Sequence, residues 1–272
     1  MNQADKAARL RALHEAKGAF VIGNAWDAGS ARVLAGLGFV ALATSSGAAA
    51  GVLGRRDGTV SRDEAMANAR AVAGACDLPV SGDLENGYGH EPQAVVETIR
   101  RAAEAGLVGG SIEDFSGDAS QPLYPLPQAV QRIEAAVGAA RALPWPFALT
   151  ARCENFLRGN PDLDDTIARL QAFERAGADV LMAPGLPDLQ SVQRVCTALR
   201  KPFNFMAGIR GKSFSVAELQ AAGVRRISLA TSLYRSAMTA LADAAREVQG
   251  QGTFGYLERT MATPDFYKLL QG

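Results

Sequence analysis

The sequence predicts an α/β protein that forms one (β/α)8 TIM barrel over residues 1–272. Three observations support this fold class. The chain has 272 residues, close to the usual size of one such barrel. A helix-to-strand phrase recurs four times, and eight apolar runs of strand length alternate with amphipathic stretches. A doubly wound open sheet is the alternative, although no G-x-G-x-x-G follows the first predicted strand.

The recurring phrase joins an Ala-rich amphipathic segment to an apolar run through a glycine. Glycine at this place is typical of the left-handed residue that ends many helices, so the phrase predicts a helix followed at once by a strand. The four copies are LAGLGFVALAT at 34–44, EAGLVGGSIED at 104–114, RAGADVLMAPG at 175–185 and AAGVRRISLAT at 221–231.

Four further apolar runs lie between these joints and bring the predicted strands to eight. They are FVIGN at 20–24, LPVSGDLE at 78–85, FALTARCE at 147–154 and KPFNFMA at 201–207. Their apolar character is almost continuous, as expected for parallel strands that are buried on both faces. Eight parallel strands alternating with helices favour closure into a barrel.

Residues 247–272 depart from the repeat, and we predict a C-terminal helical extension there. The segment QGTFGYLERTMATPDFYKLLQG at 251–272 brings several aromatic residues after a Gly-rich break. Exposed aromatic side chains need a surface to cover them. The helix either packs on its own barrel or is exchanged with a neighbouring subunit.

The composition favours a small-molecule partner inside the cell. Lys plus Arg equals Asp plus Glu at 28 each, so no net charge draws the chain to nucleic acid or anionic membranes. Cys76, Cys153 and Cys196 are odd in number and widely spaced, which predicts neither a disulfide framework nor a zinc site. The charged N-terminal segment lacks the apolar core of a secretory signal. We therefore expect a cytoplasmic protein.

One uncharged stretch, from Val33 to Leu53, is long enough to suggest a membrane span. Its glycines and serines argue against that interpretation. We predict a helix end, a buried strand and a loop of small residues instead.

Charged residues follow three consecutive predicted strands, where a barrel places its active site. They are Asp83 and Glu85 after the third strand, Glu113 and Asp114 after the fourth, and Arg152 and Glu154 after the fifth. Converging carboxylates repel one another unless a cation lies among them. Because the donors are all oxygens, the pattern favours Mg²⁺, with Mn²⁺ as a second possibility. Alternatively, the acids pair with arginines in a solvated rim.

Arg152 and a loop after the second strand are the predicted anion-binding elements. The planar guanidinium of Arg152 can hold a carboxylate by two parallel hydrogen bonds, or it can pair with Glu154 or Glu113. The loop TSSGAAAGVLGRRDG at 44–58 offers small residues whose amides can approach an anion, and Asp57 lies at its tip. We expect His90 to be a helix cap or a rim residue.

These residues occur in motifs whose order resembles the isocitrate lyase/phosphoenolpyruvate mutase superfamily. The motifs are NAWDAGSARVLAGLGFVALATSSG, LGRRDG, SGDLENGYG, SIEDF and TARCEN, and the similarity runs from about Gly18 to Arg246. The resemblance implies a (β/α)8 barrel whose eighth helix is exchanged within dimers or tetramers. It also implies a Mg²⁺-bound 2-oxo acid, or its enolate, at the barrel mouth.

The resemblance assigns roles to residues that occupy the motif positions. It implies that Mg²⁺ is held by Asp83, Glu85 and Glu113, although the family usually has Asp where Glu85 stands. It implies that Arg152 contacts the acid group of the substrate and that Asp57 lies beside the reacting centre. The segment that binds the carboxylate of the oxo acid corresponds to Ser46, Gly47 and Ala48.

The loop after the fourth strand departs from the family's lyases. Those lyases carry K-[KR]-C-G-H there, with the cysteine as the catalytic acid/base. Here the loop reads FSGDASQPLYPL at 115–126, without Cys, Lys or His. It also lacks the Lys and Asn of the mutase and phosphonopyruvate hydrolase branches.

We therefore predict a Mg²⁺-dependent carbon–carbon lyase that acts on a 2-oxo acid or related dicarboxylate through a metal-bound enolate. Oxaloacetate decarboxylation is favoured, because it needs no cysteine acid. The alternatives are cleavage of a 2-methylisocitrate-like or isocitrate-like substrate, with Asp118, Tyr124 or water replacing the cysteine, phosphonopyruvate-type C–P chemistry, and non-catalytic binding of a 2-oxo acid. We expect a homodimer or homotetramer without nucleic-acid or membrane partners.

Overall fold

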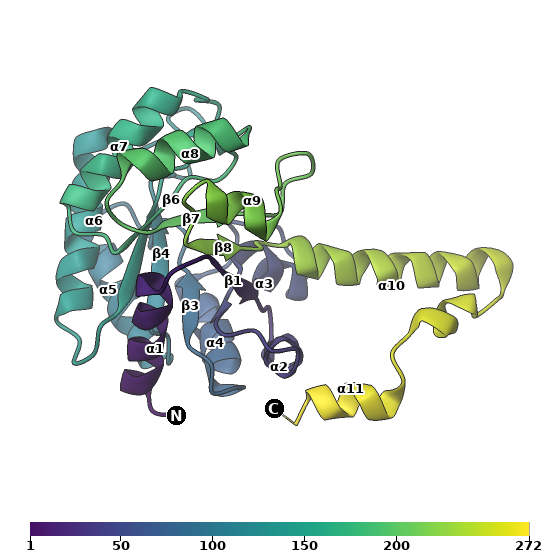
Figure 1. Ribbon diagram of the computed structural model, residues 1–272. Coiled ribbons are helices and arrows are strands. Elements are labelled where there is room, and N and C mark those ends of the chain that lie inside the picture. Colours follow the sequence, from purple (N-terminus) through teal and green to yellow (C-terminus); the bar gives the residue numbers. More distant parts are fainter. Residues whose placement is uncertain (272) are drawn as a thin grey trace.

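The computed structural model describes residues 1–271 and shows the predicted barrel of eight parallel strands (Figure 1). The strands follow one another around the barrel in chain order, and β1 pairs with β8 to close it. The strands are β1 (Phe20–Asn24), β2 (Leu42–Ala43), β3 (Val80–Asp83), β4 (Gly109–Glu113), β5 (Ala148–Arg152), β6 (Val180–Met182), β7 (Phe203–Met206) and β8 (Arg226–Ser228).

Helices surround the barrel and lie between successive strands. They are α1 (Gln3–Glu15), α2 (Ala28–Gly36), α3 (Ser46–Val52), α4 (Arg62–Gly74), α5 (Pro92–Glu104), α6 (Leu126–Arg141), α7 (Leu163–Arg175), α8 (Leu189–Ala198), α9 (Val216–Ala221), α10 (Ser232–Gln251) and α11 (Thr263–Leu269). Two short 3-10 helices, Asn155–Leu157 and Gly255–Arg259, complete the elements. The core therefore lies between the barrel and the ring of helices.

All four predicted helix-to-strand joints are present. In each, the glycine has a positive φ, between 88° and 103°, and the next residue donates its amide to a carbonyl five residues earlier. This is the hydrogen-bond pattern of a Schellman C-cap, which the conformational freedom of glycine permits. The pairs are Phe39 to Leu34, Leu107 to Ala102, Ala178 to Phe173 and Val224 to Leu219.

The uncharged stretch from Val33 to Leu53 contains the end of α2, the buried strand β2 and the helix α3. Ser46–Val52 was predicted as a loop, and that prediction was wrong. Ser45 accepts a hydrogen bond from the amide of Ala48, and a run of alanines then supplies good helix formers. No helix within residues 1–271 combines the length and the hydropathy needed to cross a membrane.

Helix α1 closes the amino-terminal end of the barrel. Ala7 and Leu10 are buried in a small apolar cluster with Ile22 and Ala148, which come from the strands. The carboxyl-terminal end of the barrel carries the loops that follow the strands, so it is the end where active sites of this fold lie.

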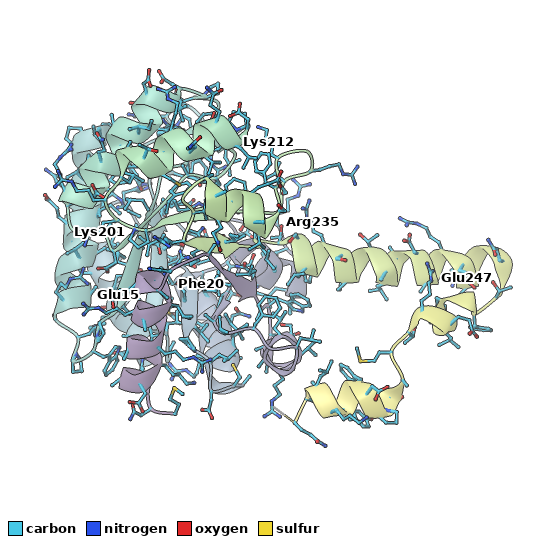
Figure 2. The ribbon with its side chains drawn as sticks, viewed as in Figure 1. Glu15, Phe20, Lys201, Lys212, Arg235 and Glu247 are labelled. Carbon is cyan, nitrogen blue, oxygen red and sulfur yellow. The ribbon has the colours of Figure 1, made fainter. Side chains whose placement is uncertain are left out.

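The C-terminal part projects from the barrel and then returns to it (Figure 1). Within the described chain, α10 has no buried residue, and it extends away from the barrel to its far end near Glu247 (Figure 2). Glu247 accepts hydrogen bonds from Thr253 and from the backbone of the following turn, which reverses the chain. Helix α11 then packs beside α2, where Arg32 donates to the carbonyl of Leu270 at 2.8 Å. The last helix thus contacts its own barrel, whereas α10 contacts the barrel near its start, where the Tyr234 ring packs edge-on against Trp26, and then projects away from it (Figure 1).

Candidate active site

A cavity of about 310 Å³ opens at the carboxyl-terminal end of the barrel. Most of the residues that the sequence singled out line it, from four different parts of the chain. They are Ser46, Gly47, Asp57, Asp83, Glu85, Glu113 and Arg152. Ala48 lies outside the lining, and its amide is used by Ser45 in capping α3. Strand ends far apart in sequence thus meet where the barrel topology predicts.

Asp83, the last residue of β3, is fixed by the start of α3. Its Oδ2 accepts hydrogen bonds from the amide and the hydroxyl of Ser46, at 3.1 and 2.9 Å. Both Ser46 donors are therefore used to orient Asp83. Its other oxygen, Oδ1, is buried without a hydrogen bond among residues 1–271, and the guanidinium of Arg152 lies 3.7 Å from it.

Glu85 sits in a strained backbone conformation with φ 48°. Positive φ at a non-glycine residue is uncommon and concentrates at functional sites. Its Oε1 is buried and has no hydrogen-bond partner in the described chain. Burial, followed by the nearby charges of Asp83 and Asp57, raises the pKa of Glu85 to about 7. This carboxyl group thus lacks a cationic partner strong enough to keep it fully ionised.

Glu113, at the end of β4, pairs with Arg152 across the neighbouring strand. Nη1 of Arg152 lies 3.3 Å from Oε2 of Glu113, and its Nε donates to Glu154. Burial raises the pKa of Glu113, and Arg152 offsets part of that rise. Burial alone would lower the pKa of Arg152, but Glu154, Glu113 and Asp83 together raise it above its ordinary value. The ion-pair alternative therefore describes the contacts of Arg152 in this structure.

Arg158 and Phe115 are among the cavity residues that the sequence reasoning missed. The guanidinium carbon of Arg158 lies 3.5 Å from the centre of the Phe115 ring, and its Nε lies 3.2 Å from Glu154. Arg158 follows Glu154 by four residues, through the 3-10 turn after β5. The four-residue spacing from Glu154 was the sequence feature that could have indicated Arg158, but the 3-10 turn is what brings its guanidinium back over the mouth.

Asp114 was predicted beside Glu113 but faces away from the cavity. Neighbouring residues of a strand point to opposite sides. Asp114 accepts hydrogen bonds from Arg169 at 3.2 Å and from the amide of Glu154 at 2.8 Å. Burial raises its pKa to about 6, and these donors limit the rise. Asp114 thus supports the strand ends instead of lining the mouth.

Asp57 lies against the start of α3. A Cβ on Gly47 would stand 3.1 Å from Oδ2 of Asp57 and 2.9 Å from a methyl carbon of Thr231. The close approach of three segments therefore requires glycine at position 47. Asp57 is exposed and reaches the cavity from the loop between α3 and α4.

The loop after β4 offers no acid at the cavity in place of the missing cysteine. Asp118 accepts two hydrogen bonds from Ser120 at 2.8 Å, and the hydroxyl of Tyr124 lies 2.9 Å from Nδ1 of His90. None of Asp118, Tyr124 and His90 is among the residues that line the mouth. The three cysteines are free thiols, and burial raises the pKa of Cys153 above its ordinary value.

The acidic cluster fits a hydrated hard cation. Within residues 1–271, no three His, Cys, Asp or Glu side chains converge as a complete ligand set. Asp83 and Glu85 nevertheless keep one buried oxygen each without a hydrogen-bond donor. Mg²⁺ commonly binds through one or two carboxylates while water and substrate fill the remaining positions. The donors present therefore suit Mg²⁺ better than an ion that needs a full protein cage.

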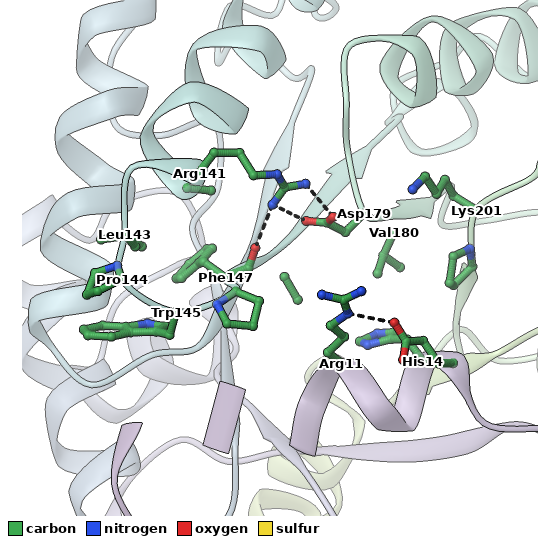
Figure 3. A pocket seen from close by; sticks show the side chains of 15 residues that line it. Arg11, His14, Arg141, Leu143, Pro144, Trp145, Phe147, Asp179, Val180 and Lys201 are labelled. Carbon is green, nitrogen blue, oxygen red and sulfur yellow. Dashed lines mark hydrogen bonds and ion pairs between the residues drawn. The ribbon is translucent and has the colours of Figure 1, made fainter. Parts of the chain in front are cut away.

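A second and larger cavity, of about 530 Å³, lies at the amino-terminal end of the barrel (Figure 3). Four of its charged groups pair with one another: Arg141 with Asp179, and Arg11 with Glu15. Strand starts and α1 form its walls. In barrels of this kind the chemistry lies at the other end, so we assign the smaller, acidic cavity as the active site.

Comparison with known proteins gives consistent results. Residues 10–249 match the family described as phosphoenolpyruvate phosphomutase. The chain is 49% identical to a candidate lyase/mutase of known structure from Burkholderia cenocepacia J2315, with a TM-score of 0.97 over 99% of this chain and 98% of that one. It is 30% identical to oxaloacetate decarboxylase 2 of Pseudomonas fluorescens, over 84% of this chain and 79% of the relative. A crystal structure of 2,3-dimethylmalate lyase shares 28% identity, with a TM-score of 0.87 over 97% of this chain and 94% of that one.

Proposed function

Because the chain belongs to the phosphoenolpyruvate phosphomutase family, within the isocitrate lyase/phosphoenolpyruvate mutase superfamily, we propose that it is a Mg²⁺-dependent lyase that decarboxylates oxaloacetate. Its relatives include oxaloacetate decarboxylases and a 2,3-dimethylmalate lyase, all of which are named for cleavage of a small dicarboxylate.

One observation carries the proposal: buried carboxylate oxygens without donors lie beside two arginines at the barrel mouth. Asp83, Glu85, Glu113 and Glu154 contribute four negative charges when ionised, and Arg152 and Arg158 contribute two positive ones. The net charge of −2 that remains would be neutralised by one divalent cation. When bound, Mg²⁺ would polarise the keto oxygen of a 2-oxo acid and stabilise the developing enolate charge.

The residues of the chain bind and orient the acid. Arg152 offers a planar guanidinium for a carboxylate once the substrate competes with Glu113 for it. Gly47 lines the cavity, where its backbone amide can donate to an anion. Asp83 and Glu85 would hold the cation, and Ser46 fixes the orientation of Asp83.

Decarboxylation matches the groups present better than the other reactions of the family. It breaks the C3–C4 bond of oxaloacetate, the bonding electrons pass to the C2–C3 enolate, and CO₂ departs. The enolate then takes one proton from water to give pyruvate. No protein acid is needed for the departing group, which agrees with the positions of Asp118 and Tyr124 outside the cavity.

The test is to incubate the protein with oxaloacetate and Mg²⁺ and to follow pyruvate. We expect release well above the rate that Mg²⁺ alone produces, with loss of the excess in the Asp83→Ala variant. An exposed substitution, Glu134→Gln on α6, serves as the matched control. A wild-type rate equal to that of free Mg²⁺ would exclude the decarboxylase.

We also propose that the chain forms a homodimer or homotetramer through α10. Met238 and Leu241 are 39% and 61% exposed on this helix, and Phe254 and Leu257 are more than half exposed just beyond it. A 20-residue helix without a buried residue in the described chain needs a covering surface to be stable. Another subunit, receiving α10 as its own outer helix, would provide that surface.

A further inference from the structure

Arg226 is a buried cation on the floor of the active-site cavity. It begins β8, it is 4% exposed, and it lines the same cavity as Asp83 and Arg152. The sequence reasoning did not single it out, and the function proposed above gives it no role.

All three hydrogen-bond partners of Arg226 are neutral. Its Nε donates to Oδ1 of Asn204 at 2.7 Å, and its Nη2 donates to the hydroxyl of Thr150 at 2.9 Å. Its Nη1 lies 3.5 Å from Nε2 of His14. The other ring nitrogen of His14 lies 2.9 Å from the carbonyl of Leu10, so Nδ1 carries the proton and Nε2 accepts. Burial, with help from Arg226, lowers the pKa of His14 to about 3, so this imidazole is neutral.

The charge of Arg226 therefore has no counterion in the part of the chain that the structure describes. A guanidinium carries five N–H donors, and the three acceptors leave two of them free. Burial lowers the pKa of Arg226 to about 10, yet the group remains charged at neutral pH. Arg152, nearer the mouth of the same cavity, has by contrast three carboxylates around it. Because an unpaired buried charge is costly, a site that keeps one implies an anion from outside the chain.

Small polar side chains line the cavity between the acidic mouth and Arg226. They include the hydroxyls of Ser81 and Ser111, each two residues below an acidic residue of the mouth, and that of Ser228. An acid entering the barrel would thus pass between these hydroxyl groups on its way to Arg226.

We propose that Arg226 forms an inner carboxylate subsite and selects dicarboxylic over monocarboxylic acids. The proposal rests on the active site assigned above. Thr150, which contacts Arg226, lies two residues below Arg152 on β5, which is about 6.6 Å along the backbone of the strand. Arg226 therefore contacts the barrel wall deeper than the strand position of Arg152, and two cations at different depths of one cavity suit an acid with a carboxylate at each end. One end meets the mouth, and the other meets Arg226.

The test compares acids that differ only in the second carboxylate. Succinate and butyrate form one pair, and 2-oxoglutarate and 2-oxopentanoate form the other. Their affinities for the intact protein with saturating Mg²⁺ are measured by calorimetry. Because a hydrogen-bonded carboxylate–guanidinium pair is worth about 1.5–3 kcal/mol, we expect the dicarboxylate of at least one pair to bind about 10- to 100-fold more tightly.

Two substitutions test whether Arg226 causes this preference for dicarboxylates. Arg226→Gln removes the charge and should reduce the preference to near unity. Asn204→Asp is nearly isosteric and places a carboxylate at the atom that already accepts from Nε of Arg226. It should raise the thermal midpoint and abolish the dicarboxylate preference, so the test does not depend on the folding of Arg226→Gln. Arg132→Gln, at a buried arginine outside the cavity, is the control and should keep the preference.

The outcomes separate this proposal from the proposed reaction. Dicarboxylate preference that disappears in Asn204→Asp supports the inner subsite, even if the wild type releases no pyruvate from oxaloacetate. Equal affinities within both pairs, or a preference that persists in Asn204→Asp, would overturn the subsite, even if decarboxylation is observed.

Discussion

Replacing Glu85 by glutamine should make the protein more stable at neutral pH when no divalent cation is present. Glu85 is a buried carboxyl near Asp83 and Asp57, and its free oxygen has no donor in the described chain. Glutamine keeps the size of the side chain and removes its titration. The variant therefore isolates the energetic effect of ionising this one group.

The magnitude follows from the pKa of Glu85. Burial and the adjacent acids raise this pKa from 4.5 to about 7, which corresponds to ~3 kcal/mol at about 1.36 kcal/mol per pKa unit. The folded state holds the proton more tightly than the unfolded state. Between pH 4.5 and about 7 the unfolded chain has already lost this proton, so the free energy of unfolding falls as the pH rises. Above about pH 7 the wild type carries the full cost.

The assay is urea unfolding in EDTA at pH 5, 6, 7 and 8. The stability gained in Glu85→Gln should grow from pH 5 to pH 8 by up to ~3 kcal/mol. Glu134→Gln, on the exposed face of α6, should show no such trend. Mg²⁺ should then stabilise the wild type at pH 8 much more than Glu85→Gln. A stability difference that does not vary with pH would refute the argument, because it would show that Glu85 titrates normally in the folded protein.

Three further changes test the mouth and the assembly. Asp83→Asn keeps an acceptor for Ser46 but loses the charge, so the Mg²⁺ concentration needed to raise the thermal midpoint should increase about 100-fold. An unchanged Mg²⁺ dependence of the thermal midpoint would remove Asp83 from the site. Arg152→Lys keeps the charge but loses the planar fork, so KM for oxaloacetate should rise about 10- to 100-fold; an unaltered KM would contradict its role. Leu241→Asp on α10 should lower the molar mass found by light scattering, whereas Gln249→Asp should not; equal masses would exclude α10 as the interface.

The sequence was sufficient to predict the barrel because each piece of evidence was local. Four glycine joints and the apolar runs between them mark where helices end and strands begin, and the structure confirms all eight strands. The gathering of Asp83, Glu113 and Arg152 was also predictable, because the carboxyl ends of neighbouring parallel strands meet. The helix α3 was missed because glycine and serine suggested a loop, while the cap and the alanine run were given too little weight.

The direction and partners of side chains were beyond the reach of sequence patterns. Asp114 differs from Glu113 by one position, and that step turns it to the outside of the barrel. Arg158 reaches the mouth only through the 3-10 turn after β5, whose geometry the sequence does not reveal. Arg226 lies at the start of its strand, away from the ends where active-site residues were sought. Its long side chain, together with residues from α1, β5 and β7, brings it to the cavity floor.

The two buried arginines of the barrel show why the acidic mouth and the basic floor belong to one site. Arg152 has more carboxylates around it than one guanidinium can neutralise, and Arg226 has none. Placing the guanidinium of Arg226 at the mouth, or one mouth carboxylate at the floor, would improve local pairing, so stability alone does not explain the arrangement. A cation at the mouth and an acid that reaches the floor would neutralise both imbalances together. Binding of the two should therefore be mutually favourable, because each relieves the electrostatic cost that the other leaves in the cavity.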